Sequence, residues 1–166
     1  MALEMFLKLA GIDGESTDAK HKGEINVLAW SWGLSEETAS STGGGGGAGR
    51  VKVENISIQK LVDIASPLLL SFSAQGKHIS DGTLTTRKAG KNGQEFLLFK
   101  MNDVIVTSVQ IAASKDAEIP TESIALNFAK FEFDYSATKP DGTLGTGKSF
   151  KWDVSGRSRL KSAQAG

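Results

Sequence analysis

The stretch ESIALNFAKFEFDY (Glu122–Tyr135) alternates apolar and polar side chains over most of its length. From Ile124 to Phe128 every second residue is apolar, which is the pattern of a β-strand with one buried face. At Ala129-Lys130 the alternation changes parity, and the apolar positions continue from Phe131 to Tyr135. A β-bulge or a bend between two sheets would produce this change. The stretch predicts one strand of about 14 residues, as long as a barrel wall or a strand that spans an oligomer requires.

Shorter segments with the same alternation lie on both sides of this stretch, and turn signals separate them. They cover residues 3–9, 24–33, 50–61, 83–88, 95–101, 104–113 and 149–154. A helix is predicted from Ser66 to Gly76, because Ser66 suits the N-cap, Pro67 the first helical position and Gly76 the end. Many short strands with one helix indicate a mainly β chain with a closed or sandwiched antiparallel fold.

Length and composition limit the classes of function. The 166 residues suit one domain with one core. The absence of Cys excludes disulfides, thiolate metal sites and cysteine nucleophiles, and 19 basic against 19 acidic residues leave no net field to attract nucleic acid. Glu4 and Lys8 interrupt the N-terminal stretch where a signal peptide would need a basic and then an apolar region. We expect a soluble protein made in the cytoplasm, with no nucleic-acid partner and no stable membrane insertion.

One segment matches a motif that carries chemistry. Gly142–Ser149 fits the phosphate-loop pattern GxxxxGK[ST]. Such a loop binds phosphate because a helix begins at its lysine, whereas the alternation after Ser149 predicts a strand, so we interpret the segment as a hairpin loop. His21 and His78 have no third residue at metal-ligand spacing and are interpreted as solvated turn residues. The sequence predicts no catalytic residue, no cofactor and no metal site, and we expect that the chain is not an enzyme.

Several blocks of the sequence resemble a known family. The stretches GESTDAKHKGEI (Gly14–Ile25) and VLAWSWG (Val27–Gly33) are similar to the haemolysin-coregulated protein (Hcp) family of bacterial type VI secretion systems. Further blocks follow in the family's order: Ala65-Ser66-Pro67, Gly76-Lys77-His78, Arg87-Lys88-Ala89-Gly90 and Pro120-Thr121-Glu122-Ser123. The resemblance extends over residues 1–153 and ends in the tail after Val154.

The resemblance implies a fold and a function. The fold would be a two-sheet antiparallel β-barrel with one flanking α-helix, formed by residues 1–154 and followed by a flexible basic tail, residues 155–166. The chain would be a structural subunit of the inner tube, a homohexameric ring that stacks into a hollow tube. Its partners would be further copies of itself, the spike protein, the sheath and small secreted effectors carried in the lumen. It would assemble in the cytoplasm and then be secreted through the type VI machine without a signal peptide.

Two segments are the candidate interaction sites. In Trp30-Ser31-Trp32-Gly33 the strand period places both tryptophans on the core side, so Ala29, Ser31 and Gly33 form an opposite, small-residue face that would line the lumen. Packing of this face against a neighbouring strand is the alternative.

A glycine-rich segment matches the family's extended loop, which would contact adjacent subunits or the next ring, although a solvated loop without a partner would have the same composition. Its residues are Ser40, Ser41, Thr42, Gly43, Gly44, Gly45, Gly46, Gly47, Ala48, Gly49 and Arg50. The alternative function for the whole chain is a monomeric or dimeric small-ligand-binding β-barrel.

Overall fold

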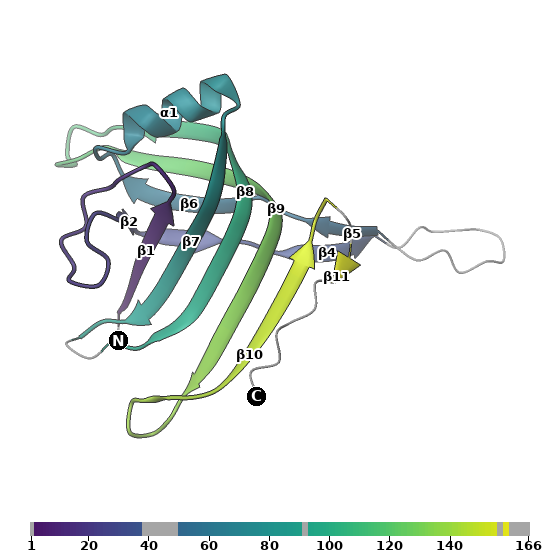
Figure 1. Ribbon diagram of the computed structural model, residues 1–166. Helices are drawn as coiled ribbons and strands as arrows, with labels where there is room; N and C mark the ends of the chain where they lie inside the picture. The colour runs from purple at the N-terminus through teal and green to yellow at the C-terminus, as the bar shows by residue number, and fades with distance from the viewer. Residues whose placement is uncertain (1, 38–49, 91–92, 156–157, 160–166) are drawn as a thin grey trace, which may run out of the picture.

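The computed structural model describes residues 2–37, 50–90, 93–155 and 158–159. Strands make up most of this part of the chain, and one helix follows the sixth strand (Figure 1). The elements are β1 (Leu3–Leu9), β2 (Ile25–Val27), β3 (Ala29–Ser31), β4 (Leu34–Glu37), β5 (Arg50–Val53), β6 (Ile56–Leu61), α1 (Ser66–Gln75), β7 (His78–Lys88), β8 (Glu95–Ala112), β9 (Thr121–Thr138), β10 (Leu144–Asp153) and β11 (Ser158–Arg159).

The large sheet curves into a nearly closed antiparallel barrel. β1 pairs with β7, β7 with β8, β8 with β9, and β9 with β6. The circuit returns to β1 along residues 25–31, because β2 pairs with β1 while β3 pairs with β6. Leu28, between these two strands, donates its amide N–H to the Gln59 carbonyl at 2.8 Å. β10 and β11 extend the sheet beyond β9, and β4 and β5 form a second, two-stranded sheet.

The paired strands β8 and β9 bend together at one line across the barrel. In a regular strand, residues three positions apart point to opposite faces. In β9, however, Phe128 and Phe131 are both buried, and in β8 Met101 and Val104 are both buried. Asp103, next to Val104, has a φ of 52°. The β8–β9 register passes this point without a shift and changes only between Val106 and Ser108. The parity change expected at Ala129-Lys130 is therefore a bend shared by neighbouring strands, and the bulge lies further along β8.

Helix α1 lies across one end of the barrel (Figure 1). Leu69 is buried and Phe72 packs against the core. The helix ends as predicted, at Gly76 in the left-handed conformation with a φ of 59°. Its start differs from the prediction, because Ala65 is the N-cap and Ser66 is already the first helical residue. The Ser66 hydroxyl therefore has other partners, which are described below.

The expected fold is confirmed, with the β4–β5 ribbon as the small second sheet and α1 as the flanking helix. Residues 95–101 and 104–113, predicted as two strands, form one continuous strand, β8, because the bend keeps the ladder intact. Most of the phosphate-loop match lies in β10, with Gly142 in the preceding turn at a φ of 86°. Of the predicted tail, Ser158–Arg159 pair with β10, and residues 160–166 lie outside the described part.

Trp32, just before β4, contacts two aromatic rings of the core and the backbone of Glu54. Its ring meets those of Phe99 and Phe131 edge to face, each at 4.9 Å, and its indole N–H donates to the Glu54 carbonyl at 2.9 Å. Truncating Trp32 removes these contacts and leaves a cavity beside two buried rings. We expect Trp32→Ala to lower the free energy of unfolding by about 3 kcal/mol in urea titrations. Leu28→Ala in the same segment, where the side chain is 54% exposed, should change it by less than about 0.5 kcal/mol. Equal stability of the two variants would contradict this packing.

Candidate functional site

The segment Ala29–Gly33 lies as its alternation predicts. Trp30 and Trp32 are half-buried and pack against the core, while Ala29 and Ser31 are exposed on the outside of the barrel. Trp30 also donates its indole N–H to the Thr86 hydroxyl at 3.2 Å. Gly33 is half-buried, and a Cβ built on it would lie 3.6 Å from a Glu54 carboxylate oxygen. Ala29 and Ser31 therefore belong to an exterior surface, and Gly33 lies at its margin.

Strand pairing extends this surface over four strands. Ser31 is opposite Ser57 in β6, Ser57 opposite Ala125 in β9, and Ala125 opposite Ser108 in β8. A second row runs parallel to the first, from Ala29 through Gln59 and Ser123 to Gln110. We call the eight residues of these two rows the small-residue face: Ala29, Ser31, Ser57, Gln59, Ser108, Gln110, Ser123 and Ala125.

The small-residue face is exposed or half-buried throughout, and none of its side chains is charged, aromatic or branched aliphatic. It can donate and accept hydrogen bonds through hydroxyls and amides, but it exerts no strong field and has no nucleophile–base pair among its residues. Only its β3 part was singled out from the sequence. The other members follow from the pairing of β6, β8 and β9, which alternation within a single strand does not reveal.

The four strands that carry this face have an unpaired edge at each end. β3 pairs only with β6 among the described strands. At the other end, β7 pairs with β8 only as far as His78 opposite Ile105, so residues 106–112 of β8 pair only with β9 within the described part of the chain. Unpaired strand edges present backbone N–H and C=O groups that another chain can pair with.

Beyond Gly33, β4 and β5 form an exposed ribbon. Glu37 is opposite Arg50, and Leu34 and Val51 are 45% and 42% exposed. Arg50 is the one residue of the predicted contact loop within the described chain; Ser40–Gly49 lie outside it. Because an isolated two-stranded ribbon is marginally stable in water, these exposed apolar residues favour a partner that covers them.

The stretch Gly14–Ile25 forms a loop that covers the outward side of β1. Phe6 points away from the core and is nevertheless buried, because His21 stacks on its ring at 4.4 Å with planes 8° apart. The guanidinium of Arg87 lies over the same ring, 4.9 Å from its centroid. His21 is thus buried, and its interpretation as a solvated turn residue is wrong. His78, by contrast, is exposed and bonds Asp103 at 2.5 Å.

Charged hydrogen bonds surround this stack. The two ring nitrogens of His21 lie 2.7 Å from carboxylate oxygens of Glu24 and Glu95. Arg87 donates to Glu4 at 2.7 Å and to both carboxylate oxygens of Asp18. The hydrogen bond from Arg87 lowers the pKa of Asp18 to about 2, and the same bond raises the pKa of Arg87. The loop is therefore held to β1, β7 and β8 by a network of charges, which we call the Arg87 clamp: Glu4, Phe6, Asp18, His21, Glu24, Arg87 and Glu95.

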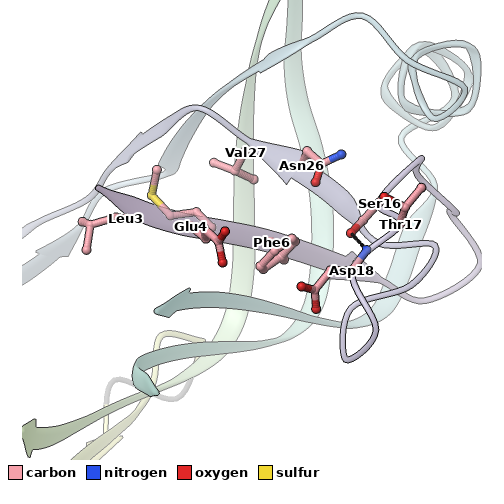
Figure 2. A pocket seen from close by; sticks show the side chains of 9 residues that line it. Leu3, Glu4, Phe6, Ser16, Thr17, Asp18, Asn26 and Val27 are labelled. Atoms are coloured by element: carbon pink, nitrogen blue, oxygen red, sulfur yellow. Dashed lines mark hydrogen bonds between the residues drawn. The ribbon is translucent and has the colours of Figure 1, made fainter. Parts of the chain in front are cut away.

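A groove of about 390 Å³ lies beside the clamp, between β1, β2 and this loop (Figure 2). Leu3, Phe6 and Val27 contribute apolar surface, and Ser16 and Thr17 contribute hydroxyls. Both carboxylates that line it, those of Glu4 and Asp18, already bond Arg87. The groove thus presents no free pair of acids for general acid–base chemistry.

The described residues also contain no group of three His, Cys, Asp or Glu side chains that could hold a metal ion, and no helix among them is long and apolar enough to cross a membrane.

Comparison with known proteins gives consistent matches. The family model described as "Type VI secretion system effector, Hcp" matches residues 6–135. The chain is 41% identical over 156 residues to "Protein hcp1" of Pseudomonas aeruginosa, covering 93% of this chain and 96% of that protein.

Solved structures agree with these sequence matches. The crystal structure of Hcp1 from Salmonella typhimurium has a TM-score of 0.77 at 34% identity and covers 96% of this chain and 100% of its own. A type VI secretion system effector from Yersinia pestis has a TM-score of 0.74 at 37% identity, over 90% of this chain and 99% of its own. A structure described as a type six secretion system protein has a TM-score of 0.89 at 27% identity, over 96% and 100% of the two chains.

The Arg87 clamp makes a prediction about acid stability. Because the pKa of Asp18 is about 2 in the folded chain, against an ordinary value of 3.8 for an aspartate, its charge stabilises the fold above pH 3.8, and this contribution disappears as the pH falls through 2. We expect Asp18→Asn to lower the melting temperature at pH 7 and to converge with the unmodified protein near pH 2. Asp116→Asn, which removes the same charge from an exposed loop, should leave the melting temperature unchanged at both values. A pH-independent effect of Asp18→Asn would show that its charge is not the cause.

Proposed function

This chain belongs to the Hcp family of type VI secretion, a family of structural tube proteins rather than enzymes, and on that premise we propose that it forms the subunit of a hexameric ring whose lumen is lined by the small-residue face. The observation that carries the proposal is the uncharged surface of eight small or polar residues across four paired strands. A channel that passes different folded effectors must not hold any of them by strong charge attraction or by a large apolar patch. Hydroxyls, amides and methyl groups meet that requirement.

The free strand edges support a ring. β3 lies at one end of the four-stranded face and residues 106–112 of β8 lie at the other, so the two edges belong to different surfaces of the chain. Pairing the β3 edge of one copy with the β8 edge of the next is a head-to-tail contact, and such contacts close into rings when the rotation between copies is suitable. Repeated around the ring, this contact would keep the small-residue faces in register on one side of a continuous wall.

The β4–β5 ribbon supports stacking of rings. Leu34 and Val51 on this ribbon are exposed, and the predicted contact loop connects its two strands. In our proposal the ribbon and Ser40–Arg50 contact an adjacent subunit or the next ring and become covered there. The outward face of β9 and β10 beyond the bend carries the pair Lys151–Glu132 at 3.6 Å and remains available for the sheath, and the tube carries the spike at its tip.

Export follows from the same proposal. Rings assemble in the cytoplasm, take up small effectors in the lumen, and leave the cell through the type VI machine. The competing function, a small-ligand-binding barrel, would place the ligand inside the barrel. That interior is filled by side chains such as Leu7, Ile58, Phe99 and Leu126, all with 0% exposure, so the described structure favours the exterior face.

The oligomeric state separates these two functions. A ring of six 17.6 kDa chains should elute near six times that mass in size-exclusion chromatography with light scattering, and negative-stain images should show rings with six-fold symmetry. A ligand-binding barrel would run as a monomer or dimer, and that result would contradict the ring.

Ser31 tests the lumen assignment. We expect Ser31→Gln to leave ring formation and melting temperature unchanged, because the longer side chain extends into open space, while recovery of a co-expressed effector with the ring changes. If Ser31 instead packed against another strand, the added atoms would cost about 1 to 3 kcal/mol. Ser149→Gln on β10 is the matched control, because this residue is also an exposed serine in a strand but lies outside the small-residue face. Broken rings with Ser31→Gln would place Ser31 in an interface, and equal effector recovery in all three proteins would contradict the lumen assignment.

A further inference from the structure

A charged pair lies buried where helix α1 meets the barrel. Lys60 of β6 and Glu122 of β9 have side chains with 0% exposure, and the Lys60 ammonium donates to a Glu122 carboxylate oxygen at 2.7 Å. The ammonium also donates to Asp63 Oδ1 at 2.8 Å and to the Leu61 carbonyl at 2.9 Å. Both residues occupy positions that alternation assigns to the core. Alternation gives no reason to expect a charge there.

Ser66 links this pair to the helix. Its hydroxyl donates to Glu122 Oε2 at 2.5 Å and accepts the amide N–H of Asp63 at 3.0 Å. Ala65, the N-cap, makes no side-chain cap, and the first turn of α1 contains no acidic residue. Glu122 and Asp63 therefore supply, from outside the helix, the negative charge that a helix N-terminus favours.

The pair is a poor source of stability. Removing two charges from water is costly, and apolar replacements of buried ion pairs are often neutral or stabilising. The cost is higher here because Glu122 Oε1 is also buried and has no hydrogen-bond partner within the described chain. A buried ion pair that costs stability points to a role in choosing one structure over its alternatives.

The alternative that the pair excludes is a slipped alignment of two strands. Lys60 and Glu122 are directly opposite in the β6–β9 ladder, and the next core pairs are Ile58–Ile124 and Ile56–Leu126. A slip of two residues that brings Ile58 opposite Leu126 would keep apolar side chains opposite apolar ones at Ile56 and Ile58. It would, however, separate the two buried charges and leave each without its partner, which is strongly unfavourable.

We propose that Lys60 and Glu122 form a register lock, which fixes the alignment of β6 on β9 and, through Ser66, the position of the first turn of α1. This role goes beyond the proposed function and does not require a ring. By fixing the alignment, the lock also sets Gln59 beside Ser123 on the small-residue face.

The link to the helix is tested at Ser66. In Ser66→Ala the pair remains but its hydrogen bond to the helix is lost. We expect hydrogen–deuterium exchange of peptides from α1 to become at least tenfold faster, while peptides from β6 and β9 exchange as before. Ser66→Thr retains the hydroxyl and should restore slow exchange. Unchanged exchange in Ser66→Ala, equal acceleration in the barrel, or equal acceleration in both variants would overturn the link.

The alignment is tested by disulfide trapping, which is clean because the chain has no Cys. Gln59→Cys with Ser123→Cys reports the observed register, whereas Gln59→Cys with Ala125→Cys or with Thr121→Cys reports a slip of two residues in either direction. In the otherwise unmodified protein only the Ser123 combination should cross-link efficiently. In the Lys60→Met/Glu122→Leu background we expect at least one slipped combination to cross-link as well.

Stability measured by urea titration completes the test. Lys60→Met and Glu122→Leu alone should each lower the urea midpoint, and the double variant should recover a midpoint at or above that of the unmodified protein. Ile58→Val/Ile124→Val, one core pair along the same strands, should lower the midpoint and keep a single register. A double variant that keeps a single register, or that is less stable than either single variant, would overturn the lock.

Discussion

Strand β9 pairs with three other strands although a strand has only two edges, and the shape of the barrel follows from this. One edge pairs with β8 along nearly the whole strand, while the other pairs first with β6 and then with β10. The change of partner coincides with the bend at Ala129-Lys130, where β8 turns in parallel without losing register. The two halves of the wall then differ in chemistry. The half before the bend in β9 carries the small-residue face, and the half after it carries partly exposed ion pairs such as Lys100–Asp134.

Features that repeat within one segment were predictable from the sequence. The parity change in β9 required a bend or a bulge, and Pro67 and Gly76 marked the helix, because each signal depends on side chains a few positions apart. Contacts between distant segments were not predictable. His21 was interpreted as a solvated turn residue and Lys60 was not singled out, because their surroundings come from Glu122, Glu95 and Phe6, which other strands supply. Likewise, Ser57 and Ser123 join the face of Ser31 only through the register.

The geometry of Gly14–Ile25, a stretch that carries the family resemblance, restricts which residues can occupy it. A Cβ on Gly14 would lie 2.5 Å from the Glu24 carbonyl oxygen, so no larger residue fits without moving the backbone. Gly23 has a φ of 75°, which favours glycine. Asp18 and His21 hold the loop to Arg87, Glu95 and Phe6. Substitution at these positions would leave a buried charge unpaired or a ring uncovered, so the local geometry restricts which residues fit in this stretch although it lies outside the proposed channel.

The proposed channel wall has the opposite character. Ser31, Ser57 and Ser123 make no side-chain hydrogen bonds to one another in the described structure. They suit a channel wall because they provide no charge and no large apolar surface that would hold a cargo. A surface that must release its cargo benefits from weak and evenly distributed contacts, because every strong site would slow passage. Specific interactions are therefore placed where they fix the wall itself, in the Arg87 clamp outside β1 and the buried Lys60–Glu122 pair behind β6 and β9. The protein uses its charged and buried polar groups to hold the strands in one alignment, and that alignment allows the exposed side of the same strands to remain uniform.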